Sequence, residues 1–194
     1  MIEAQRTKTI LMREITFPKI VSDIMGVSIF VALTSLGAFV RIPLPFTPIP
    51  ITLQTLFVLL SGVILGSKLG GISQFLYLFL GAIGLPIFAG ATGGLAYLAG
   101  PTGGYIIGFV LAACITGKVA GKPKNNFFHI ILAMSLGTVV IYLAGGLGLI
   151  YTLKIGIKEI FYLGIAPFIS GDIIKLTAAA LIAKAIHFTS SSSR

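Results

Sequence analysis

The sequence predicts an all-α membrane protein, a bundle of six transmembrane helices. Of its 194 residues, 56% are hydrophobic and only 10% are charged, whereas a soluble domain carries about 25% charged residues. No charged residue occurs between positions 69 and 117, a run far longer than the ~20 residues that one transmembrane helix needs. Clusters of proline and glycine divide the apolar sequence into segments of helical length.

These segments predict the helices in chain order. We expect helices over residues 24–40, 51–65, 69–85, 105–116, 127–150 and 167–187. Pro167 is expected in the first turn of the sixth helix, where a missing backbone N–H costs little. Residues 154–164 predict a loop with at most one short surface helix. We expect these helices to form one six-helix transmembrane domain at residues 20–188, between an N-terminal segment at 1–19 and a polar C-terminal tail at 189–194.

Two segments between the helices are not expected to be helical. Residues 41–54, RIPLPFTPIPITLQ, contain four prolines, each of which lacks a backbone donor and disfavours the helical conformation in the residue before it. They predict an extended, polyproline-like strap between the first two helices. Residues 84–104 are rich in glycine and predict a long, apolar, tightly folded loop between helices three and four.

The basic residues predict the orientation in the membrane. Six helices place both termini on one side, and cytoplasmic segments carry an excess of Lys and Arg. Ten of the 14 basic residues fall on the side of the termini, whereas Arg41, Lys154 and Lys158 fall on the other side and Lys175 lies within a helix. Both termini are therefore expected in the cytoplasm, and the strap and the glycine-rich loop outside. Topology also explains the net charge of +9 without a nucleic-acid partner.

Asp172 and Lys175 are charged residues inside a predicted transmembrane helix. At positions i and i+3 they share one helix face and can pair. A charge at the bilayer centre costs about 2.5–3.5 kcal/mol on insertion scales, so the pair predicts a functional site. The alternative is a self-neutralising pair that only packs the bundle. Gln54, at the junction of the strap and the second helix, offers an amide donor and acceptor, or else bonds free backbone groups at the helix start.

The sequence favours a binding protein over an enzyme. It contains no P-loop, Gly-x-Ser-x-Gly, His-Glu-x-x-His or Cys-x-x-Cys motif, so no ATPase, hydrolase, metal or cofactor site is indicated. A small integral-membrane enzyme with Asp172 and Lys175 as an acid–base pair remains an alternative, although no nucleophile or metal set accompanies them. In the first helix, Ser28 and Ala32 stand four residues apart, a spacing of small residues that permits close contact with a partner helix.

Four segments resemble the BioY family, the biotin-specific S components of energy-coupling-factor (ECF) transporters. They are PFTPIPITLQTLFVLLSG at 45–62, GLPIFAG at 84–90, GPTGGYIIGF at 100–109 and PFISGDIIK at 167–175. The resemblance extends from the first helix through the sixth, in order. It implies a six-helix protein in the cell membrane, in contact with lipid, that captures biotin from outside. The implied partners are a transmembrane coupling subunit and two cytoplasmic ATPases that drive release inward.

The resemblance also implies roles for particular residues. Gln54 matches the family's glutamine, and Asp172 and Lys175 match its Asp-x-x-Lys pair. Tyr97 and Gly103 fall in the loop that covers the vitamin. Phe88 is expected to form an apolar wall of the pocket. Ser28 and Ala32 are expected to contact the coupling subunit.

The sequence departs from the family's pattern at two positions. Ser170 stands where many members have proline, a difference at the start of the sixth helix. Ser28 replaces one alanine of the Ala-x-x-x-Ala pattern that contacts the coupling subunit, and serine is still small. An S component for another vitamin would share the architecture and differ only in the pocket.

Overall fold

The computed structural model describes residues 18–121 and 127–192. The elements in chain order are α2 (Lys19–Phe39), β1 (Arg41–Leu44), β2 (Thr47–Thr52), α3 (Gln54–Ala82), α4 (Leu95–Leu98), α5 (Gly103–Ala120), α6 (Phe127–Leu153), α7 (Ile157–Ile160), the π-helix η1 (Phe161–Ile165) and α8 (Ala166–Ser192). Five helical spans within the described residues are long and apolar enough to cross a membrane. Residues 1–17 of the expected N-terminal segment at 1–19, and residues 193–194 of the expected tail at 189–194, lie outside the described residues.

The long element α3 contains two of the predicted helices. Gly66 interrupts it with φ 79° and ψ 175°, a backbone conformation that glycine adopts readily and other residues do not. The break falls directly after residue 65, where the sequence predicts the end of the second helix. Because α3 bends here, its two halves both pack against α5: a Cβ on Gly117 would lie only 2.3 Å from the backbone nitrogen of Ser67.

The final helix begins about ten residues earlier than the sequence predicts. Residues 154–156 are non-helical, but α7, η1 and α8 then continue into one another, so a loop up to residue 164 is wrong. Pro167 lies in this helix and has no N–H for the preceding turn. The π-turn and two side chains compensate: Thr47 Oγ1 donates to the carbonyl of Leu163 at 2.8 Å, and the Tyr105 hydroxyl donates to that of Gly164 at 2.8 Å.

The proline-rich strap is extended, as predicted, but it forms a β-hairpin rather than a single polyproline-like segment. β1 and β2 are antiparallel, with Arg41 opposite Thr52 and an irregularity between Ile42 and Leu44. Thr47 and Ile49 of β2 are buried, while the residue between them is exposed. One side of the hairpin therefore covers the helix bundle.

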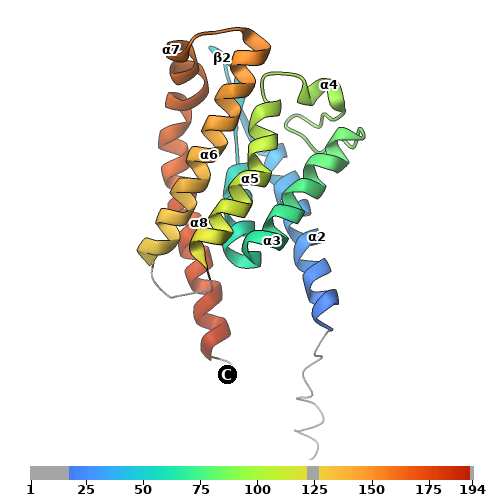
Figure 1. The fold of residues 1–194 in the computed structure, drawn as a ribbon, viewed down its shortest axis with the longest axis vertical. Coiled ribbons are helices and arrows are strands. Elements are labelled where there is room, and N and C mark those ends of the chain that lie inside the picture. Colours follow the sequence, from blue (N-terminus) through green and yellow to red (C-terminus); the bar gives the residue numbers. More distant parts are fainter. Residues whose placement is uncertain (1–17, 122–126, 193–194) are drawn as a thin grey trace, which may run out of the picture.

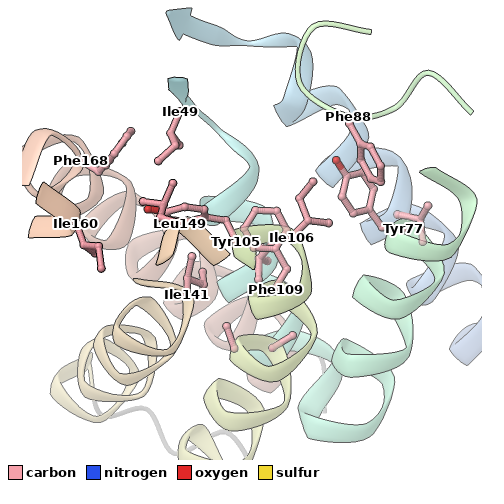
Figure 2. Close-up of a cluster of buried hydrophobic side chains, with 14 residues drawn as sticks. Ile49, Tyr77, Phe88, Tyr105, Ile106, Phe109, Ile141, Leu149, Ile160 and Phe168 are labelled. Atoms are coloured by element: carbon pink, nitrogen blue, oxygen red, sulfur yellow. The ribbon is translucent and has the colours of Figure 1, made fainter. Parts of the chain in front are cut away.

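The glycine-rich loop is folded around a stack of aromatic rings. Phe88 is fully buried and packs edge-on against Tyr77 of α3, at 5.5 Å between ring centroids, and face-on against Tyr97 of α4, at 5.3 Å. Glycine is needed beneath the stack, because a Cβ on Gly81 would lie 2.1 Å from the Phe88 ring. Figure 2 shows Tyr77 and Phe88 side by side at one edge of a buried apolar cluster. The rings anchor the loop to the bundle.

The ends of the bundle differ in character. The hairpin, α4 and α7 lie at one end, while the first turn of α2 and the last turns of α8 lie at the other (Figure 1). We call the first the loop end and the second the helix end. The hairpin and the glycine-rich loop are thus at the loop end, where the ligand-binding residues were expected.

Candidate ligand-binding site

A cavity lies beneath the hairpin and the glycine-rich loop. The space between atoms there amounts to about 540 Å³, a figure that includes the part open to solvent. Its walls come from the hairpin, the glycine-rich loop, and α3, α4, α5, α6 and α8. The lining residues are Ile49, Pro50, Thr52, Gln54, Thr55, Ala89, Tyr97, Thr102, Tyr105, Ile106, Phe109, Ile141, Tyr142, Phe168, Asp172 and Lys175. Mostly apolar walls with a few convergent polar groups are typical of small-molecule sites.

Lys175 makes as many hydrogen bonds as an ammonium group can donate. It is buried and forms an ion pair with Asp172, one turn earlier on α8. Its Nζ also donates to Thr55 Oγ1 at 2.9 Å and to the backbone carbonyl of Thr52 at 3.1 Å. Since an ammonium group has three N–H donors, Lys175 has none left for a ligand. Its charge neutralises Asp172, and its bonds attach α8 to the hairpin.

Asp172 retains capacity to accept a further hydrogen bond. Lys175 and Thr55 approach Oδ1, the latter at 3.4 Å, and the Tyr142 hydroxyl donates a short hydrogen bond to Oδ2. An ionised carboxylate offers about four acceptor positions, so these three donors leave one available. Asp172 lines the cavity, and a ligand N–H is the group that this position can bind.

Gln54 is held in one orientation by its neighbours. Its Nε2 donates to the Tyr77 hydroxyl at 2.6 Å, and its Oε1 accepts from Thr52 Oγ1 at 3.0 Å. The Tyr77 hydroxyl in turn donates to the carbonyl of Ile87 in the glycine-rich loop at 3.1 Å. The side chain therefore faces the cavity instead of bonding free backbone groups at the helix start. One amide N–H and one carbonyl lone pair remain for a ligand.

The other expected ligand-binding residues occupy different positions around the cavity. Tyr97 lines it and donates to the Ala89 carbonyl at 3.3 Å. Phe88 lies behind Tyr97, as part of the ring stack. Gly103 is buried at the start of α5, where a Cβ would lie 1.7 Å from the Leu98 carbonyl oxygen. The neighbouring Thr102 lines the cavity.

Several polar side chains that line the cavity or bond its residues were not found by sequence reasoning, and four of them bond Gln54 or Asp172 directly. Thr52 and Thr55 flank Gln54, and Tyr77 and Tyr142 lie within apolar helices. Threonine and tyrosine are common in such helices, so their identity alone gives no signal. A hydroxyl deep in a long apolar segment could have been noted, because it needs a partner there.

Ser28 and Ala32 are not among the residues that line this cavity and lie on an exposed face of α2. Both are exposed, as are the nearby apolar residues Met25, Ile29 and Leu36. The face combines small residues with large apolar ones and is not covered by the described part of this chain.

The fold and the cavity together define a multi-pass membrane protein with a binding site for a small molecule that has polar and apolar parts. A family model described as "BioY family" matches residues 6–192, and the chain belongs to this family.

Comparisons with individual proteins agree. The probable biotin transporter BioY of Pyrococcus horikoshii is 45% identical over 165 residues, which cover 85% of this chain and 96% of that protein. The biotin transporter BioY of Thermotoga maritima is 42% identical over 83% of this chain and 93% of its own length. A crystal structure of the S-component for biotin from an ECF-type ABC transporter has a TM-score of 0.83 and 28% identity, covering 89% of this chain and 94% of that one.

Proposed function

We propose that this protein is the biotin-binding S component of an ECF-type ABC transporter. It captures biotin outside the cell and delivers it inward together with a transmembrane coupling subunit and two cytoplasmic ATPases. The observation that carries the proposal is the cavity beneath the hairpin, in which Asp172 and Gln54 present unused hydrogen-bonding positions beside apolar walls. A member of the BioY family is expected to use such a site for its vitamin.

The chemistry of biotin suits these groups. Its ureido ring has two N–H donors and one carbonyl, and the rest of the molecule is apolar apart from a terminal carboxylate. Asp172 accepts one ureido N–H, and the free amide N–H of Gln54 donates to the ureido carbonyl. Lys175 pairs with Asp172 and holds it in place. The apolar part of the ligand then packs against Ile106 and the neighbouring apolar walls.

The glycine-rich loop covers the bound vitamin in this proposal. Tyr97 contacts the ligand directly, whereas Phe88 supports Tyr97 from behind. Gly103 permits the close approach of α5 to α4 and so places Thr102 at the cavity. The roles proposed for Phe88 and Gly103 are thus to shape the wall.

The proposed location is the cell membrane, with both termini in the cytoplasm. The excess of basic residues on the side of the termini supports this orientation. The helix end of the bundle then faces the cytoplasm, where the ATPases bind. The loop end, with the cavity beneath it, faces outside.

A comparison of ligand binding tests the function. Purified protein in lipid nanodiscs is titrated with biotin by calorimetry, with riboflavin and thiamine as matched ligands of other S components. We expect saturable binding of biotin alone. Absence of biotin binding, or binding of another vitamin in its place, would overturn the proposal.

Contact with the coupling subunit is tested at Ala32. Because this residue is exposed on α2, Ala32→Leu should leave biotin binding unchanged but prevent close helix packing. Loss of the coupling subunit from affinity-purified complexes is the expected result, and Ala32→Ser, which keeps the residue small, serves as a control. Normal assembly of the Ala32→Leu variant would assign the contact to another face.

A further inference from the structure

The polar groups that line the cavity leave the carboxylate of an anionic ligand without a partner. Lys175 is the positive charge that lines the cavity, but its three donors are occupied by Asp172, Thr55 and Thr52. The Asp172–Lys175 pair is neutral as a whole. A ligand carboxylate would therefore gain neither a net attraction nor a free donor there, and it would lie beside the Asp172 carboxylate.

A second cation lies where the hairpin meets the glycine-rich loop. Arg41 is opposite Thr52 in the hairpin, and side chains of directly paired residues project from the same face of a sheet. Thr52 lines the cavity. Arg41 therefore leaves the backbone directly beside a residue that lines the cavity.

The position of the guanidinium group agrees with this placement. A Cβ built on Gly90 would lie 2.4 Å from Arg41 Nη1 and 2.9 Å from Cζ, so the guanidinium group lies directly against the Gly90 backbone. Ala89, the residue before Gly90, lines the cavity. Arg41 thus spans from one lining element to another, at the rim between hairpin and loop.

The Arg41 guanidinium group is available for an anion. Arg41 is exposed, and across residues 18–121 and 127–192 no carboxylate lies within ion-pairing distance of it. A guanidinium group presents five N–H donors in a planar fork that matches a carboxylate with two parallel hydrogen bonds. Gly90, with φ +87°, has no side chain to fill the space beside it.

We propose that Arg41 binds the carboxylate of the ligand at the rim of the cavity, while Asp172 and Gln54 bind its ureido ring. This inference rests on the proposed function and adds an orientation to it: the ring lies deep, against α8, and the acid lies at the rim between the hairpin and the loop. Arg41 is then a specificity-determining residue that selects the free acid over neutral derivatives.

The test compares two ligands that differ only in the carboxylate. Affinities for biotin and for its neutral amide, biotinamide, are measured on the whole protein in nanodiscs, for wild type, Arg41→Gln, Arg41→Lys and Lys158→Gln. The last variant removes another cation at the same end of the bundle, and so controls for general electrostatic attraction. Thermal unfolding of each variant without ligand reports whether the fold is intact.

We expect the wild type and Lys158→Gln to prefer biotin over biotinamide by about tenfold, as for one charge-assisted contact that is partly exposed to solvent. Arg41→Gln should lose this preference, because the affinity for biotin falls to that for biotinamide while the affinity for biotinamide stays unchanged. Arg41→Lys should retain part of the preference.

A preference that survives in Arg41→Gln would overturn the inference, and so would an equal loss for both ligands, which would mark Arg41 as a support for the loop. If the wild type bound neither ligand, the proposed function would fail instead, so the two failures are distinguishable.

Discussion

Two buried polar clusters lie within the helix bundle, and only one of them borders a cavity. The Asp172 cluster comprises Thr55, Tyr142, Asp172 and Lys175. The Gln74 cluster comprises Thr34, Ser61, Ser73 and Gln74, all fully buried, and it joins α2 to both halves of α3. Gln74 Nε2 lies 3.2–3.3 Å from the hydroxyl oxygens of the other three.

The difference between the clusters supports a ligand-binding role for the Asp172 cluster and a packing role for the Gln74 cluster. Both clusters lie among apolar helices, but Thr55 and Tyr142 are only partly buried, whereas every member of the Gln74 cluster is fully buried. The Gln74 cluster is neutral and its groups bond one another, so it closes the contact between helices. The Asp172 cluster includes charges and leaves an acceptor position facing empty space. An unused hydrogen-bonding position beside a cavity is therefore the useful criterion.

The largest effect on biotin affinity is expected from Asp172→Asn. The substitution removes the charged acceptor for the ureido N–H, and a lost hydrogen bond to a charged group corresponds to about 1.5–3 kcal/mol, or about 10- to 150-fold in the dissociation constant. Calorimetric titration in nanodiscs measures it. Asp23→Asn, in the first turns of α2, is the matched control and should bind normally.

Because Asp172→Asn also leaves Lys175 without its ion pair, the double variant Asp172→Asn/Lys175→Gln tests the cause. It restores neutrality, so its thermal stability should recover while its biotin affinity stays low. Wild-type affinity in either variant would place the Asp172 cluster in the same class as the Gln74 cluster.

A smaller loss is expected from Tyr142→Phe. The tyrosine hydroxyl orients Asp172 through a short hydrogen bond, and the ring that remains still fills the wall. A net hydrogen bond of about 0.5–1.5 kcal/mol predicts a loss of about two- to twelvefold in biotin affinity. An affinity loss as large as that of Asp172→Asn would show that Tyr142 contacts the ligand itself.

The smallest effect on binding is expected from Gln74→Leu. Affinity should stay within about twofold, while the stability falls by about 1 kcal/mol, seen as a lower thermal midpoint in detergent. The loss is small because Ser61 and Ser73 still donate to carbonyls of their own helix, at 2.7 Å each. Loss of biotin binding in a folded Gln74→Leu protein would contradict the division between the two clusters.

Sequence reasoning was most successful where a physical cost limits the possible structures. Charges in a membrane are costly, so Asp172 and Lys175 were singled out by their position in an apolar segment, and the structure places both beside one cavity with Gln54. The helices were found because apolar length sets the number of membrane spans. Gly66 was correctly predicted to end the second helix. Glycine adopts positive φ readily, and this conformation breaks α3 at that residue.

The features that sequence reasoning missed depend on contacts between distant segments. The prolines exclude a helix at residues 41–54, but they do not determine whether the extended chain folds back on itself as a hairpin. The early start of the last helix depends on Thr47 and Tyr105, which satisfy the two carbonyls near Pro167 from other elements. Tyr142 becomes part of the site only because α6 packs beside α8.

The attachment of the hairpin at two points has a consequence for the rate of ligand release. Thr47 bonds the carbonyl of Leu163, and Lys175 bonds that of Thr52, so both ends of β2 are already fixed in the structure without ligand. Binding then does not have to order this wall, and the ordering cost of about 0.5–1.5 kcal/mol per immobilised side chain is avoided. Affinity gained in this way appears chiefly as a longer residence time. A capture subunit that must hold a scarce vitamin until its partners act would benefit from slow dissociation.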